Sequence, residues 1–164
     1  MKLRLLLSKQ CNRNCEGCCN KDFDLDKLPV VTDYSGYDEI ILTGGEPMLR
    51  PNFIREMVRR IRKQTLVPIY LYTAKVDRLQ SALAVLGIID GICVTLHEQS
   101  DVEAFHKLEN AIDYSLGKSL RVNIFKGVKI FIDHLQWKVK SGIEWIKNCP
   151  LPKDEIFARV EEKI

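Results

Sequence analysis

The sequence predicts an α/β fold: a single-domain partial (βα) barrel with about six mainly parallel strands, open on one side. Short apolar runs alternate with segments of helical periodicity along most of the chain. Regular strand–helix–strand repeats form right-handed crossovers and parallel sheets. The predicted strands are apolar almost throughout, as strands covered on both faces are. Five strands are clear, which is too few to close an eight-stranded barrel.

The first two strands are expected at Leu3–Leu7 and Glu39–Leu42, which are short aliphatic runs bounded by polar residues. Between them, Phe23–Tyr37 lacks helical periodicity and contains Pro29, Gly36 and several aspartates. We therefore expect an irregular first connection that covers the site formed after the first strand.

A helix is expected at Asn52–Lys63, where Pro51 marks the start. Its apolar positions have the i, i+3, i+4, i+7 spacing of one buried face. These positions are Ile54, Met57, Val58 and Ile61.

Two further strand–helix pairs follow. The strands are Ile69–Thr73 and Ile92–Leu96, and the helices are Val76–Leu86 and Val102–Leu116. Gly87 and Gly117 stand where the two helices are expected to end.

The last third of the chain is expected to contain a fifth strand at Leu120–Phe125 and a sixth at Val128–Ile132. Beyond His134 the pattern weakens, and we expect short helices at Gly142–Lys147 and Asp154–Glu162. The whole chain, 1–164, is interpreted as one domain, of which about 134–164 is the part least defined by pattern.

Composition excludes several classes of function. A net charge of +3 does not indicate nucleic-acid binding. No run approaches the roughly 20 apolar residues that cross a membrane. The apolar N-terminal stretch lacks a cleavage site and is interpreted as a strand, so we expect a cytoplasmic protein. Six cysteines in a reducing compartment favour a metal site over disulfides.

Three of these cysteines form a C-x3-C-x2-C motif directly after the first predicted strand. Cys11, Cys15 and Cys18 can bind three irons of a [4Fe-4S] cluster and leave the fourth iron without a protein ligand. A structural zinc site is the alternative, but zinc favours a closed set of four ligands. Cys19 is adjacent to Cys18 and points elsewhere if Cys18 binds metal.

A second motif, GGEP, follows the second predicted strand. Gly44 and Gly45 allow backbone groups to approach a ligand closely, Glu46 can accept a hydrogen bond from an ammonium group, and Pro47 fixes the turn. An ordinary strand-to-helix turn is the alternative. Because both motifs follow parallel strands, both are expected at the same edge of the sheet, where functional loops gather.

The two motifs together resemble the radical S-adenosylmethionine (radical SAM) superfamily. The resemblance implies a [4Fe-4S] cluster whose open iron binds the amino and carboxyl groups of S-adenosylmethionine, with the GGEP loop at the methionine amino group. It also implies reductive cleavage of S-adenosylmethionine to methionine and a 5′-deoxyadenosyl radical. The residues assigned to the cofactors on this basis are Gly17, Cys18, Cys19, Gly44, Gly45, Glu46, Pro47 and Thr73.

Within the superfamily, the stretch CEGCCNK resembles the activating protein of anaerobic ribonucleotide reductase. Gly17, Asn20 and Lys21 match that motif, while Glu16 and Cys19 replace its usual Pro and Tyr. The resemblance implies a large glycyl-radical enzyme as partner and an electron donor such as flavodoxin or ferredoxin. A radical SAM enzyme that modifies a small molecule or peptide, and a non-catalytic iron–sulfur module, remain alternatives.

Other residues are assigned provisional roles. Arg55, Arg59 and Arg62 share one helix face by spacing and form either a solvated surface or a docking face for an acidic partner. Cys93 is expected to be a buried small hydrophobe, and no second cluster is predicted from Cys19, Cys93 and Cys149. The polar residues expected at strand ends, facing cofactor or substrate, are Tyr72, Thr73, Lys75, His97, Glu98, Asn123 and Lys126.

Overall fold

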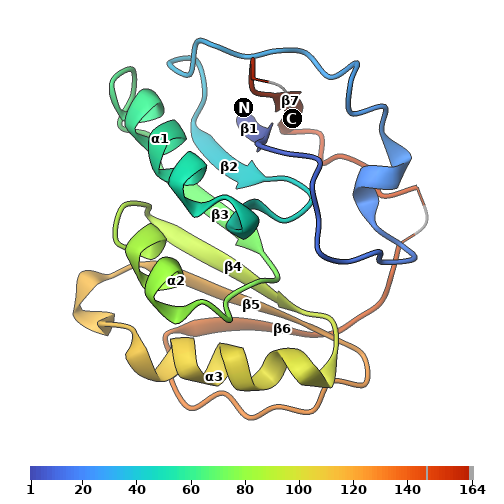
Figure 1. Cartoon of the computed structure of the whole chain (residues 1–164), viewed down its shortest axis with the longest axis vertical. Helices are drawn as coiled ribbons and strands as arrows, with labels where there is room; N and C mark the ends of the chain where they lie inside the picture. The colour runs from blue at the N-terminus through green and yellow to red at the C-terminus, as the bar shows by residue number, and fades with distance from the viewer. Residues whose placement is uncertain (147, 163–164) are drawn as a thin grey trace.

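The computed structural model describes residues 1–146 and 148–162, and its framework is one seven-stranded, wholly parallel sheet (Figure 1). The strands are β1 (Lys2–Leu6), β2 (Glu39–Thr43), β3 (Ile69–Thr73), β4 (Gly91–Leu96), β5 (Ser119–Phe125), β6 (Trp137–Ile143) and β7 (Glu155–Arg159). Their spatial order is β6-β5-β4-β3-β2-β1-β7, so β6 and β7 form two unjoined edges. The prediction of an open partial barrel is confirmed.

Three helices lie on one side of this sheet: α1 (Pro51–Arg62), α2 (Leu79–Leu86) and α3 (Val102–Ala111) (Figure 1). Alternate strand residues, including Leu3, Leu71 and Val94, pack with them in the main hydrophobic core. Successive residues of a strand point to opposite faces, so the residues between these core positions point away from the helices.

We call the side of the sheet that the helices leave uncovered the open face. The strand pairing places Arg4, Ile41 and Tyr70 on it in one row, and Tyr72, Cys93, Arg121 and Lys138 in the next. Thr95, Asn123 and Lys140 form a third row.

Four single-turn 3₁₀ helices complete the element list: η1 (Cys19–Asp22), η2 (Pro47–Leu49), η3 (Gln99–Asp101) and η4 (Tyr114–Leu116). The third helix was predicted to reach Leu116, but it ends at Ala111 because the backbone of Ile112 is extended. Asp113 then caps η4 by accepting a hydrogen bond from the Ser115 amide. Gly117 ends the turn as predicted, in the left-handed conformation with φ 62°.

The predicted sixth strand at Val128–Ile132 is wrong. This segment follows a turn and forms no strand. Its alternating pattern arises because Val128, Ile130 and Ile132 pack against the core, whereas Phe131 is 77% exposed. A loop that lies along the core thus produces the same period of two as a strand.

The two C-terminal helix predictions are also wrong. Where a helix was expected from Gly142, the chain is still in β6, and residues 144–146 are irregular; Lys147 lies outside the described residues. The stretch Asp154–Glu162 forms the short strand β7, which pairs with β1. The strand conformation of both segments is set by pairing at the edges of the sheet and not by the local periodicity of their residues.

The search for membrane spans found no helix in the described residues that is both long and apolar enough to cross a bilayer.

Candidate functional site

The carboxyl ends of the central strands surround a cavity of about 230 Å³. Its lining comes from the cysteine loop after β1, from the GGEP loop after β2, and from the ends of β3 and β4. The residues are Cys11, Arg13, Cys15, Cys18, Cys19, Asn20, Thr43, Gly44, Gly45, Glu46, Tyr72, Thr73, Ala74, Thr95, His97 and Trp145. The two motifs, about 25 residues apart in sequence, therefore share one site.

Two of the residues assigned to the cofactors do not line this cavity. Gly17 lines a neighbouring cavity of about 490 Å³, together with Cys18 and Trp145. Pro47 is buried and begins η2, so its role is to fix the turn. The irregular segment 23–37 was expected to cover the site, but it runs along β7 instead: Val30 bridges to Arg159, and Phe23 packs on Phe157.

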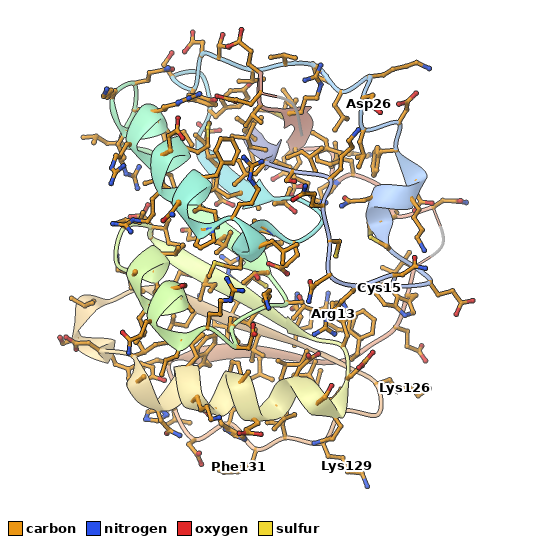
Figure 2. The ribbon with its side chains drawn as sticks, viewed as in Figure 1. Arg13, Cys15, Asp26, Lys126, Lys129 and Phe131 are labelled. Carbon is orange, nitrogen blue, oxygen red and sulfur yellow. A yellow bond between two sulfur atoms is a disulfide. The ribbon has the colours of Figure 1, made fainter. Side chains whose placement is uncertain are left out.

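The cysteine loop is held by a few local hydrogen bonds. The Lys21 ammonium donates to the Cys15 carbonyl at 2.7 Å, and the Cys18 amide donates to the same oxygen at 3.4 Å. The Arg13 amide donates to Cys11 Sγ at 3.4 Å, a contact of the kind that tunes a cluster-bound sulfur. Figure 2 shows Arg13 and Cys15 on this loop, beside the ends of the strands.

The donor set fits an iron–sulfur cluster better than zinc. Cys11, Cys15 and Cys18 are free thiols, and the nearest further thiol, Cys19, is bonded to Cys149. Four sulfurs on one zinc would lie about 3.8 Å apart, given Zn–S bonds of about 2.3 Å. Among the described residues, the three cysteine sulfurs are not grouped within 4.8 Å of one another. Three free thiols also fall one short of the closed set of four ligands that a structural zinc site favours.

The GGEP loop is pressed directly against the chain leaving β1. The Gly45 amide donates to the Ser8 carbonyl and the Glu46 amide to the Gln10 carbonyl, both at 2.8 Å. A Cβ on Gly45 would lie 2.3 Å from the Gln10 oxygen. The glycine pair makes room for the loop that carries Cys11, and both glycines also line the cavity.

A side chain fastens the two loops further. The Asn20 amide group donates to the Gly44 carbonyl at 2.8 Å. Asn20 is one of the residues on which the CEGCCNK resemblance rests, and its contact joins the chain just after the third cysteine to the GGEP loop.

Glu46 is almost completely buried, with 3% exposed area. Its carboxylate accepts hydrogen bonds from the Met48 amide at 2.9 Å, the Thr73 hydroxyl at 2.5 Å and the Ala74 amide at 2.9 Å. Burial raises the pKa of Glu46, and these donors counteract part of that rise. Glu46 therefore fixes the end of β3 to the GGEP loop while remaining in the cavity wall.

An ion pair that sequence reasoning missed anchors the cysteine loop. Arg13 binds both carboxylate oxygens of Asp101, which also accepts from the His97 amide at 2.9 Å and the Glu98 amide at 3.0 Å. Burial raises the pKa of Asp101, but the Arg13 and backbone hydrogen bonds outweigh it and hold that pKa below its usual value. The two partners are 88 residues apart, and no local pattern links them.

Aromatic side chains close the site on the β4–β5 side. The His97 ring stacks on Trp145 at 5.3 Å and packs on Phe125 at 4.7 Å. The pKa of His97 is lowered mainly by burial and to a smaller extent by the charge of Arg13, and this favours the neutral imidazole. Trp145 lines both cavities, and Gly17 accommodates it because a Cβ there would lie 2.5 Å from the tryptophan Cβ.

A disulfide between Cys19 and Cys149 joins the cysteine loop to the C-terminal segment. The Cys149 amide also donates to Asp22 at 3.0 Å. The cysteine content was expected to favour a metal site over disulfides, and for this pair that expectation is wrong. The individual roles of Cys19 and Cys149 were left open, because pairing cannot be read from spacing. The bond holds the segment after Trp145 next to Cys18.

The other polar residues at strand ends divide into two groups. Tyr72, Thr73 and His97 line the cavity as expected. The others have local partners: Lys75 pairs with Asp77, Lys126 with Glu144, Glu98 caps η3, and Asn123 donates to Cys93 Sγ at 3.3 Å. Cys93 is buried, as predicted, and burial raises its pKa to about 11.

Comparison with known proteins gives limited but consistent support. No family model matches the chain. A segment of 70 residues is 33% identical to a probable GTP 3′,8-cyclase from Pyrococcus abyssi (strain GE5 / Orsay), covering 37% of this chain. The chain spans 22% of the length of that relative. The similarity supports the resemblance to the radical SAM superfamily in general, and it does not extend to the activating-protein subtype.

Proposed function

We propose that this protein is a radical SAM enzyme that binds a [4Fe-4S] cluster and S-adenosylmethionine and cleaves the latter reductively. The observation that carries the proposal is the meeting of three free thiols and the GGEP loop on one cavity. The cluster would supply the electron that splits the sulfonium into methionine and a 5′-deoxyadenosyl radical.

The protein's own residues would hold and orient the reactants. Cys11, Cys15 and Cys18 would be the three protein ligands. The backbone of Gly44 and Gly45, braced by Glu46 and Thr73, would present acceptors to the amino end of the ligand. Preorganised polar groups of this kind lower the cost of aligning a bound reactant.

Binding of S-adenosylmethionine to the open iron is testable by electron paramagnetic resonance. We expect the signal of the anaerobically reconstituted, reduced protein to change shape when S-adenosylmethionine is added, because one iron gains two ligand atoms. An unchanged spectrum at saturating S-adenosylmethionine would remove this protein from the class, and Cys93→Ala, which alters no proposed ligand, is the control.

As the finer function we propose activation of a glycyl-radical enzyme such as anaerobic ribonucleotide reductase, with flavodoxin or ferredoxin as electron donor. The support is the CEGCCNK stretch with its Asn20 contact. Arg55 and Arg59 are exposed on α1, whereas Arg62 is bound by Asp90 and contributes less to a docking face. Failure to form a glycyl radical in any co-encoded reductase would refute this finer function.

A small-molecule substrate is the second candidate. The observation that favours it is a group of three cations on the open face, Arg121, Lys138 and Lys140, for which the described residues provide no ion-pair partner.

A further inference from the structure

The open face carries three cations on adjacent strands. Arg121 on β5 is paired in register with Lys138 on β6, and Asn123 is paired with Lys140. Trp137, which precedes Lys138, is buried against Phe105 of α3. Because strand residues alternate between faces, Lys138 and Lys140 point away from the helices, to the same side as Arg121.

None of the three cations lines the cavity, but Arg121 and Lys140 lie in register rows that begin at its wall. Arg121 is paired through Cys93 with Tyr72, in one row across β3, β4 and β5. The next row runs from Thr95 to Asn123 and Lys140. Tyr72 and Thr95 both line the cavity that holds the cysteines. A molecule that extends out of the cavity along the sheet would therefore reach the three cations.

Four other cations around the site have acidic partners, and Lys21 donates to the Cys15 carbonyl. Arg13 binds Asp101, Arg4 binds Glu155, Lys75 binds Asp77 and Lys126 binds Glu144. Within the part of the chain that the structure describes, no ion pair within 4 Å involves Arg121, Lys138 or Lys140. Among the described residues, these three cations therefore have no carboxylate within ion-pair distance.

Arg121 is the least solvated of the three. It is half-buried, and its guanidinium lies 5.5 Å from the centre of the Tyr70 ring. Arg121 is paired in register with the buried Cys93, and Lys140 lies two residues beyond Lys138, the β6 partner of Arg121. A partly desolvated guanidinium without a carboxylate partner is costly, and an anionic ligand would offset that cost.

We propose that Arg121, Lys138 and Lys140 bind the phosphate group of a small-molecule substrate whose reacting part enters the cavity beside the cysteines. This inference rests on the proposed radical SAM function, because the substrate in question is the substrate of that reaction. A phosphate carries up to two negative charges and matches the planar fork of an arginine. Three cations in one patch match the charge of a phosphate better than the single negative charge of a carboxylate.

The test is calorimetric titration of the anaerobically reconstituted protein with inorganic phosphate as the probe. We expect the parent protein to bind one phosphate, and Arg121→Gln to weaken the affinity roughly tenfold or more, because a charge-assisted hydrogen bond is lost. The double variant Lys138→Gln/Lys140→Gln should weaken binding to a similar degree. Lys129→Gln is the matched control. This exposed lysine lies in the loop before β6 (Figure 2), where its amide donates to the Gln99 side chain, and not on a strand of the open face. The affinity of this variant should equal that of the parent.

Two results would overturn the proposal: no phosphate binding by the parent, or equal affinity in Arg121→Gln and the parent. Binding of an acidic peptide in place of phosphate would identify a protein-docking face and would also overturn it. Failure of the phosphate site and failure of the proposed radical SAM function give different results. Protein that binds phosphate here but forms no 5′-deoxyadenosine would refute only the radical chemistry, and the reverse result would refute only the phosphate site.

Discussion

Replacing Cys11, Cys15 or Cys18 by alanine is expected to abolish the cluster. The anaerobically reconstituted parent should be brown and contain about four irons per chain, and each variant should lose nearly all of them. The physical reason is the ligand count: three thiols line the cavity, and Cys19, the only other one there, is held in a disulfide with Cys149. Losing one ligand therefore leaves two, without a substitute nearby. Iron analysis and absorbance of the purified variants measure the effect.

The matched control is Cys93→Ala. Cys93 is buried in β4, and its sulfur accepts a hydrogen bond from Asn123. This variant should retain the iron of the parent. Full iron and colour in Cys11→Ala would show that the cluster assignment is wrong.

Gly45→Val is expected to impair both the cluster and the binding of S-adenosylmethionine. From sequence alone, the added side chain would obstruct only the ligand and spare the cluster. The structure revises this expectation, because the Cβ would lie 2.3 Å from the Gln10 carbonyl, one residue before Cys11. The nearest atoms belong to the backbone carbonyls of Gln10 and Lys9, so the cysteine loop itself must shift to admit the side chain. Overpacking of this kind typically costs roughly 1–3 kcal/mol of stability.

Gly36→Val provides the control for this second substitution, since a Cβ on Gly36 would meet nothing within 4 Å. Thermal unfolding of the iron-free proteins and iron content after reconstitution should separate the two variants. If Gly45→Val matched the parent in melting temperature, iron content and ligand affinity, the close packing of the two loops would be of no consequence.

The central strands and helices could be predicted from the sequence because each is specified by its own residues. In α1, for example, Phe53, Ile54, Met57, Val58 and Ile61 are all buried on one face. The edge strands could not be predicted. β6 has lysines on the open face, which is typical of a strand that must resist further pairing, and the five residues of β7 become a strand only by pairing with β1.

In the site too, locally specified features could be predicted from the sequence and long-range contacts could not. The cysteine and GGEP motifs were recognisable because their spacing is local, and the structure brings them to one cavity. The contacts that support them are distant in sequence: Arg13 with Asp101, Gly17 with Trp145, and Cys19 with Cys149. No periodicity or spacing signals such pairs. The last two pairs depend on how the C-terminal segment returns to the cysteine loop, and that segment follows β6, the strand that the sequence did not reveal.

The most direct test of the central claim is the formation of 5′-deoxyadenosine. Anaerobic protein with its reconstituted, reduced cluster is incubated with S-adenosylmethionine, and the products are quantified by liquid chromatography and mass spectrometry, with Cys15→Ala as the cluster-free control. We predict equal amounts of methionine and 5′-deoxyadenosine from the parent protein and none from the variant. Fully reconstituted and reduced parent protein that binds S-adenosylmethionine yet forms no 5′-deoxyadenosine would contradict the account.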